Sequence, residues 1–179
     1  MKQILLMTMM ICLFNAEAVR GQTLRDVAAT SGHDAIFFNP SRHGSTADVM
    51  SRFDREMVKA FRAAWRNAGN GLTAVEAVIL IIRKADGSCK AVLPDPKGQH
   101  YRFTFRLQPG TIAVVHTHPN DSDPRPATAD IEIAERFQVP MFTLTIRGMF
   151  LYDPTTKVTS RVQGGKDWLI SSKWARYRQ

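Results

Sequence analysis

The sequence of 179 residues contains little cysteine and no long apolar run. Its cysteines are Cys12 and Cys89, and Cys12 lies in a segment that we expect to be removed, so no internal disulfide supports the mature chain. No apolar run reaches the ~20 residues that a membrane-spanning helix needs. There is also no internal repeat and no long low-complexity segment. A single domain is therefore the expectation for this length.

The first 18 residues have the pattern of a secretory signal peptide. Lys2 precedes the short apolar segment ILLMTMMICLF, and Ala16-Glu17-Ala18 offers the small-x-small pattern that suits signal peptidase. Cleavage after Ala18 would leave 161 of the 179 residues, enough for one well-buried core. We predict export to a periplasm or out of the cell, with no retained transmembrane anchor. A retained N-terminal anchor is the alternative.

Acidic side chains are fewer than basic ones. The chain has 16 Asp and Glu against 24 Lys and Arg, a formal net charge of +8. This excess favours anionic partners such as phospholipid, acidic cell-wall polymer or nucleic acid, without choosing among them. The basic segment 161–179 contains Trp168 and Trp174, and we predict a closing helix there. It is either a solvated helix or a binding surface for an anionic envelope polymer or membrane; no specific nucleic-acid recognition is expected.

The apolar pattern predicts an α/β fold, with a single-domain mixed β-sheet flanked by helices. Residues 45–71 carry apolar side chains at three- and four-residue steps, which is typical of one amphipathic helix that starts at Ser45 or Thr46 and ends before Gly69. A second helix is predicted to begin near Thr128. The order of elements indicates a β-meander followed by a βαβ unit. Strands are predicted at 74–83, 89–93, 100–107, 111–118, 141–146 and 149–154.

Two histidines end the strand predicted at 111–118. Because alternate residues of a strand face the same side, His116 and His118 lie ~6.6 Å apart along the chain on one face. Imidazole is a ready zinc ligand, and Asp130 in the first turn of the next helix can supply a third donor. Two His and one Asp leave the fourth tetrahedral position open for water, which zinc makes acidic.

Two other interpretations of these residues remain open. The histidines can be a hydrogen-bonded strand end or a surface pair that binds metal adventitiously. Asp121 and Asp123 can instead be oxygen ligands, for example of calcium, although two carboxylates are few for such a loop.

Glu76 is the candidate general base for this site. It lies just before the apolar residues VILII, where a lone carboxylate is costly unless it is paired or near a cation. A place beside Zn²⁺ would account for it. An exposed strand start or a helix end is the alternative.

Taken together, these residues resemble the zinc site of the JAB/MPN-domain (JAMM) metalloproteases. The resemblance rests on Glu76, on His116-Thr117-His118-Pro119 and on Asp130 at a helix start, and it covers roughly residues 47–160. The sequence VPMFTLTIRGMFLYDP is similar to the strand-turn-strand that follows the metal helix in that family.

The family implies a deaminase-like three-layer arrangement and one Zn²⁺ per chain, held by His116, His118 and Asp130. It also implies Glu76 as the base that takes the proton of a zinc-bound water, and a peptide or isopeptide bond as the substrate. On this view 19–46 is a partly flexible N-terminal segment, and 161–179 is a basic tail.

The sequence departs from the family pattern at two places. Eleven residues, rather than the usual ten, separate His118 from Asp130, and Ala127 stands where the family has a serine that helps to hold the oxyanion. Thr128 or Ser122 can replace that hydroxyl. We therefore expect an exported zinc metallopeptidase or amidase that acts on a peptide or protein amide, with Thr128 as a catalytic candidate. The alternatives are a weak or inactive JAB-like envelope binding module and a toxin-like effector.

Overall fold

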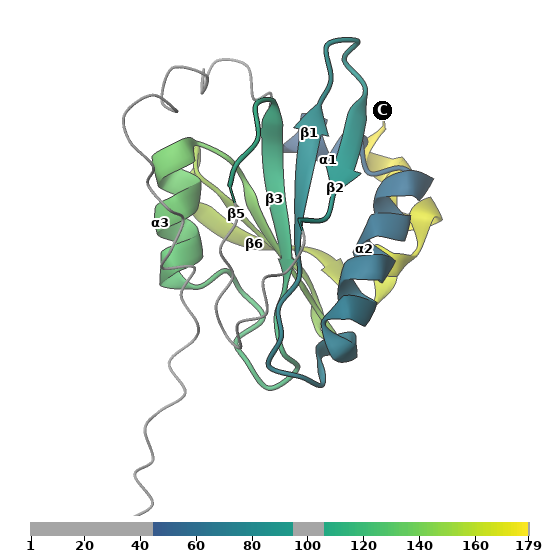
Figure 1. The fold of residues 1–179 in the computed structure, drawn as a ribbon, viewed down its shortest axis with the longest axis vertical. Coiled ribbons are helices and arrows are strands. Elements are labelled where there is room, and N and C mark those ends of the chain that lie inside the picture. Colours follow the sequence, from purple (N-terminus) through teal and green to yellow (C-terminus); the bar gives the residue numbers. More distant parts are fainter. Residues whose placement is uncertain (1–44, 95–105, 179) are drawn as a thin grey trace, which may run out of the picture.

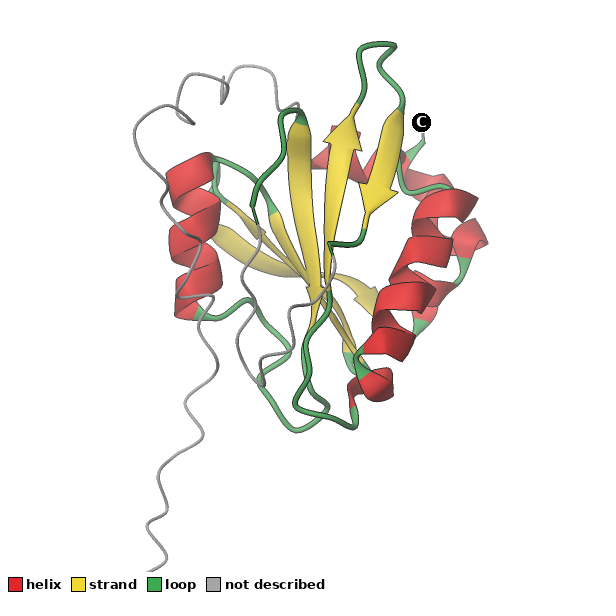
Figure 2. Ribbon diagram, viewed as in Figure 1, coloured by secondary structure: helices red, strands yellow, loops and turns green. Residues whose placement is uncertain are grey.

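Figure 1 shows the computed structural model of the protein, which describes residues 45–94 and 106–178. Six strands in these ranges form one mixed sheet of order β2-β1-β3-β4-β5-β6, with helices on both faces (Figure 2). The predicted α/β class is confirmed. Expectations for residues 1–44, and for most of the strand predicted at 100–107, lie outside the described residues. The strands are β1 (Val78–Arg83), β2 (Cys89–Val92), β3 (Thr111–Thr117), β4 (Met141–Thr145), β5 (Gly148–Asp153) and β6 (Val158–Gly164).

The centre of the sheet contains the predicted βαβ unit. β3 pairs with β4 in parallel, and α3 (Thr128–Phe137) connects them, whereas the other neighbouring strands of the described sheet are antiparallel. A parallel pair needs such a crossover because both strands run the same way. The first turn of α3 therefore follows directly from the loop at the carboxyl end of β3. Residues 116 and 130 are brought to one end of the sheet by this connection.

Each face of the sheet has its own apolar core. α1 (Thr46–Ser51), α2 (Arg55–Asn67) and the C-terminal 3₁₀ helices cover one face, while α3 covers the other (Figure 1). β1 is buried on both sides, which explains its unbroken apolar sequence. The core on the α3 side includes Leu80, Val114 and Ile133, and it ends where His116 begins the polar part of β3.

The single helix predicted for residues 45–71 is wrong, because the structure has two helices there. α1 ends at Ser51, and Asp54 starts α2 by accepting the backbone N–H groups of Glu56 and Met57 at 2.9 Å. A capping carboxylate competes with continuation of the helix. Phe53, between the two helices, is fully buried against the aromatic core. The predicted cap at Ser45 is confirmed, since its hydroxyl accepts the N–H of Asp48.

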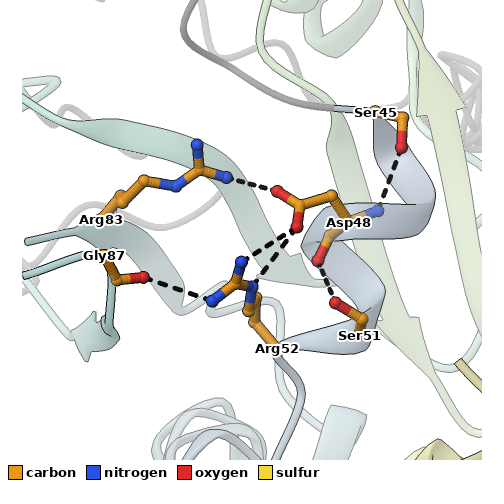
Figure 3. A network of polar contacts seen from close by, with 6 residues as sticks. All are labelled: Ser45, Asp48, Ser51, Arg52, Arg83 and Gly87. Atoms are coloured by element: carbon orange, nitrogen blue, oxygen red, sulfur yellow. Dashed lines mark hydrogen bonds and ion pairs between the residues drawn. The ribbon is translucent and has the colours of Figure 1, made fainter. Parts of the chain in front are cut away.

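An ion-pair network joins α1 to the β1–β2 hairpin (Figure 3). The Asp48 carboxylate lies between two guanidinium groups, accepting from Arg83 through one oxygen and from Arg52 at 3.1 Å through the other. Arg52 also donates to the carbonyl oxygen of Gly87, in the hairpin turn, at 3.3 Å. These side-chain contacts attach the short helix α1 to the β1–β2 hairpin of the sheet. Nearby Cys89 is partly buried, and burial raises the pKa of its thiol, which fits a structural role.

The C-terminal segment differs from the predicted closing helix. Residues 158–164 form β6, a strand that we did not predict, and the chain then makes two 3₁₀ helices, η4 (Asp167–Leu169) and η5 (Ser171–Tyr177). Trp168 and Trp174 are fully buried in the core under α2, so they are not available to bind a polymer. None of the helices in the described ranges is both long and apolar enough to cross a bilayer.

Candidate metal centre and cleft

Strand β3 places both histidines at its carboxyl end. His116 pairs with Val78 of β1 and with Thr143 of β4, so it is held from both sides. His118 continues this arrangement by donating its backbone N–H to the carbonyl oxygen of Leu144 at 3.0 Å. Both side chains are buried, with exposed fractions of 0% and 6%. The interpretation of the pair as an exposed surface feature is therefore excluded.

Three donor atoms converge at this point. Nε2 of His116 lies 3.0 Å from Nε2 of His118 and 3.2 Å from Oδ2 of Asp130, and the third side of the triangle is 3.7 Å. Tetrahedral zinc with bonds of 2.0–2.1 Å would separate its ligand atoms by about 3.3 Å. The three observed separations bracket that length. Among the described residues these three side chains form the group that is positioned to hold a metal ion.

Asp130 reaches the histidines because of its place in α3. It is the third residue of the helix, and its Oδ2 also accepts the backbone N–H of Ala127 at 2.7 Å. Ala127 is the N-cap residue and Thr128 is the first residue of the helix, as the predicted start near Thr128 requires. The bond to Ala127 fixes the carboxylate of Asp130 and keeps its oxygen directed at the two rings.

His118 is oriented from behind by a backbone group. Its Nδ1 atom lies 2.7 Å from the carbonyl oxygen of Asp123. A carbonyl can only accept, so Nδ1 carries the proton and Nε2 of the neutral ring presents its lone pair to the metal position. His116 has no equivalent support among the described residues, because its Nδ1 is buried without a hydrogen-bond partner.

The loop that supplies this carbonyl is held at several points. The hydroxyl of Thr143, which is fully buried in β4, donates to the carbonyl oxygen of Pro124, and the Arg147 guanidinium donates to that of Ser122. Farther back, the N–H of Asn120 donates to the carbonyl oxygen of Gly71 at 2.8 Å. Segments from three parts of the chain thus keep residues 119–126 in place.

Glu76 lies beside the same cluster, although it is in the connection before β1 rather than in a strand. Ala77 holds it there, because its N–H donates to the hydroxyl of Thr117 at 2.9 Å and its carbonyl accepts the N–H of Thr117 at 3.0 Å. Burial raises the pKa of Glu76, and the charge of Asp130 adds to this, while His116 and His118 act in the opposite direction. The side chain of Glu76 is half-buried rather than exposed.

The charges of the cluster act on one another. Burial alone would raise the pKa of Asp130, but the adjacent His116 and His118 hold it well below its usual range. Burial alone would lower the pKa of His118, but its contact with Asp130 and the nearby Glu76 raise it instead. Two carboxylates and two imidazoles therefore require a positive charge at their centre, which either a proton or a metal ion can supply.

A cleft of about 340 Å³ opens on the cluster. Glu76 and His118 line one part, and Thr128 and Ile131 of α3 line another. Both hydroxyl candidates, Thr128 and Ser122, border this cleft together with Ala127. The structure thus brings all five predicted site residues to one place: Glu76 and His118 line the cleft with Thr128, and His116 and Asp130 lie directly beside His118.

The donor set fits zinc better than calcium. Two imidazole nitrogens and one carboxylate oxygen are typical zinc ligands, whereas calcium takes six to eight oxygens. The alternative through Asp121 and Asp123 is not supported, because the Asp123 carboxylate is paired with Arg125 at 2.6 Å. Hydrogen bonds from Arg125 lower the pKa of Asp123 to about 2.

Sequence reasoning missed the residues that support the ligands. Thr117, Thr143 and Arg147 had no recognisable spacing, and the contribution of Asp123 is a backbone carbonyl that any residue could supply. The apolar sequence around Thr143 was the one available signal, since a buried hydroxyl needs a partner.

Comparison with known proteins adds no relative. No protein-family model, no curated protein and no solved structure matches this chain.

Proposed function

We propose that this protein is an exported zinc-dependent metallopeptidase or amidase that hydrolyses a peptide or isopeptide bond. The observation that supports it most strongly is the buried triangle of His116, His118 and Asp130 with the carboxylate of Glu76 beside it. A structural metal site would use four protein ligands, whereas a three-ligand site beside an acid and an open cleft suits catalysis. We also propose that the fold has the MPN/JAB arrangement, in which these positions have these roles.

The ligands and Glu76 have separate tasks in this proposal. When bound, zinc supplies Lewis-acid chemistry, polarising the amide carbonyl and making a water molecule acidic. Glu76 accepts a proton from the attacking water while the oxygen of that water bonds to the carbonyl carbon. It then returns the proton to the nitrogen as the carbon–nitrogen bond breaks. The raised pKa suits the first step, because it makes the Glu76 carboxylate a stronger base toward the water than an ordinary carboxylate.

The oxyanion that develops on the carbonyl needs a donor. Ala127 has no hydroxyl, and Thr128 at the start of α3 takes this role, with Ser122 as the other hydroxyl on the cleft. One such donor contributes about 10²–10³ in rate. Thr128→Val should therefore lower kcat far more than it lowers zinc content.

The decisive experiment combines metal analysis with cleavage of a peptide library. The wild type is expected to bind one zinc per chain and to cleave a subset of the library. His116→Ala should lose both properties, while Glu76→Gln should keep the zinc and lose cleavage. If His116→Ala binds as much zinc as the wild type, the ligand assignment is wrong. If Glu76→Gln cleaves at the wild-type rate, the base assignment is wrong.

A second candidate is a non-catalytic binding module with the same metal site, and the missing hydroxyl at Ala127 favours it. In that case the wild type binds zinc but cleaves no member of the library. Glu76→Gln would then leave its binding partner and affinity unchanged.

A further inference from the structure

The outer face of α2 carries a row of basic side chains. Arg55, Lys59, Arg62 and Arg66 follow one another at steps of four, three and four residues, so they lie along one side of the helix. All four are exposed, while the opposite side of α2 is buried through Met57, Phe61 and Trp65 among others. The basic row is therefore a fixed feature of the surface, because the packing of the helix determines which side faces outward.

The C-terminal 3₁₀ helices extend this row into a wider basic face. The Arg62 guanidinium donates to the carbonyl oxygen of Leu169 at 2.6 Å, which places η4 next to α2 (Figure 1). Eight basic and three acidic side chains lie on these elements and on the residues that cap them, an excess of five positive charges. We call this surface the basic face. Its basic residues are Arg55, Lys59, Arg62, Arg66, Lys166, Lys173, Arg176 and Arg178, and its acidic residues are Asp54, Glu56 and Asp167.

The opposite side of the sheet is different. α3 carries the acidic residues Asp130, Glu132 and Glu135 and one basic residue, Arg136. The basic face thus carries an excess of positive charge, whereas α3, which borders the proposed cleft, carries more acidic than basic side chains. An anionic partner attracted to the basic face would leave α3 uncovered.

Two aliphatic side chains on segments next to the basic face are exposed. Leu72, just after the turn that follows α2, is 82% exposed, and Ile170, between η4 and η5, is 43% exposed. The three tryptophans of this region, in contrast, are turned inward, and Tyr177 is partly buried. Trp65, Trp168 and Trp174 have exposed fractions of 4%, 0% and 0%.

We propose that the basic face docks on the surface of an anionic phospholipid bilayer, with Leu72 and Ile170 entering the headgroup region. Clustered Lys and Arg side chains are attracted to anionic lipid, and exposed aliphatic side chains add an apolar contribution that water-exposed polyanions do not offer. Single-stranded nucleic acid is disfavoured because its bases need exposed aromatic rings for stacking. The proposal does not depend on zinc or on hydrolysis.

Docking would also orient the metal centre. The carbonyl oxygen of Gly71, next to Leu72, accepts the N–H of Asn120, two residues after His118. The end of the molecule that contains the metal ligands is therefore the end that carries Leu72. A docked protein would leave its cleft, which lies on the α3 side, uncovered.

Vesicle co-sedimentation tests the proposal on the full chain. The probes are vesicles of phosphatidylcholine alone and vesicles with equal parts of phosphatidylglycerol and phosphatidylcholine. The wild type should bind the anionic vesicles at least about tenfold more tightly, and the difference should shrink as salt rises from 50 to 200 mM. The triple variant Arg55→Gln/Lys59→Gln/Arg66→Gln should lose at least about tenfold in affinity. Arg62 is left unchanged because it holds η4.

A matched control removes the same amount of charge elsewhere. Lys84→Gln/Lys90→Gln/Arg136→Gln neutralises three exposed residues on the β1–β2 hairpin and on α3, and it should change the affinity by less than about threefold. Thermal melts establish that each variant folds. Leu72→Gln should weaken binding to anionic vesicles. The affinity of this variant should fall with rising salt as steeply as that of the wild type.

Three outcomes would overturn the proposal. The first is equal binding of the wild type to both kinds of vesicle. The second is an equal loss of affinity in the α2 variant and the control, since only net charge would then matter. The third is tighter binding to a duplex oligonucleotide than to anionic vesicles at the same salt, which would identify nucleic acid as the partner.

Discussion

The Nδ1 atom of His118 lies 2.7 Å from the backbone carbonyl oxygen of Asp123. This contact determines which ring nitrogen of His118 carries the proton, and it leaves Nε2 as an acceptor facing His116 and Asp130. The carbonyl belongs to a loop whose next residue, Pro124, accepts a hydrogen bond from the buried hydroxyl of Thr143. The affinity of the proposed metal site is thus linked to a side chain of β4 that is not itself a proposed ligand.

Thr143→Val should weaken zinc binding by about 10–100-fold, because loss of support behind a ligand commonly has this effect. It should also cost about 1–3 kcal/mol of unfolding free energy, since the carbonyl of Pro124 loses its partner. Competition with a chromophoric chelator measures the first effect, and urea unfolding of metal-free protein measures the second.

Thr111→Val is the matched control for Thr143→Val. Thr111 is equally buried, and its hydroxyl donates to the carbonyl oxygen of Gln108 at 2.7 Å, at the other end of β3. It should cost similar stability and leave zinc affinity unchanged. Equal zinc affinities for the two variants would show that the Asp123 loop does not position His118.

Removal of Asp130 should abolish stabilisation by zinc. A ligand at a hundred times its Kd stabilises the native state by about 2.7 kcal/mol, which corresponds to about 5–10 °C in Tm for a chain of this size. The wild type should show this rise when zinc replaces EDTA, whereas Asp130→Asn should not. Asp121→Asn, which changes an exposed carboxylate of the preceding loop, should respond to zinc like the wild type. A zinc-dependent rise in the Tm of Asp130→Asn would contradict the ligand set.

Glu76→Gln should make the metal-free protein more stable. Burial raises the pKa of Glu76 in the folded state above its ordinary value of 4.5. The folded protein therefore holds a proton that the unfolded chain releases between these two pKa values, and stability falls as pH rises through that window. At pH values above this window Glu76 is ionised in the folded protein, and stability is lowered by the full free energy of burying its charge. Glutamine has no charge and removes this cost.

Thermal melts in EDTA at several pH values measure this effect of Glu76. The variant should melt above the wild type at pH 7, and the two should converge as pH falls below 4.5, the lower end of the window. Glu132→Gln, on the exposed side of α3, is the control and should change little at any pH. Identical melting curves for wild type and Glu76→Gln at pH 7 would show that the carboxylate bears no cost of burial.

Trp174→Ala should cost about 3–5 kcal/mol of unfolding free energy, as is usual for a large aromatic removed from a core. Its ring lies 4.9 Å from the ring of Phe53 and 6.2 Å from that of Phe61, measured between centroids. Ile170→Ala, at an exposed position between the two 3₁₀ helices, should cost much less. Chemical denaturation measures both values. If Trp174→Ala lowers the unfolding free energy as little as Ile170→Ala does, the C-terminal segment is not part of the core.

Much of the fold was predictable because its elements have strong local patterns. β1 and β3 are buried on both faces and appear as unbroken apolar runs, and the Asp86-Gly87 turn signals the hairpin that follows β1. The break before α2 was missed because apolar spacing continues through Phe53, while the capping carboxylate of Asp54 ends the first helix. β6 was missed because its first four residues are exposed, so that burial leaves no alternating pattern.

The candidate site was predictable in part for a different reason. His116, His118 and Asp130 lie within fifteen positions, and the periodicity of a strand and the start of a helix bring them together. The position of Glu76 depends on Thr117, forty residues along the chain from Ala77, through a hydrogen bond between a side chain and the backbone. Such a contact leaves no periodic trace in the sequence. The spacing indicated which residues to consider, but the three-dimensional pairing of β1 with β3 brings Glu76 to them.

Because Glu76 is positioned by the pairing of β1 with β3, mutations can affect Glu76 and the three metal ligands separately. All three donor atoms come from the one segment between residues 116 and 130, whereas the carboxylate of Glu76 comes from the connection that leads into the neighbouring strand β1. A mutation that shifts the register of β1 against β3 by one residue would turn the side chains of β1 to the other face of the sheet. On the proposed function, the result would be a chain that sequesters the metal ion yet has lost its capacity for turnover.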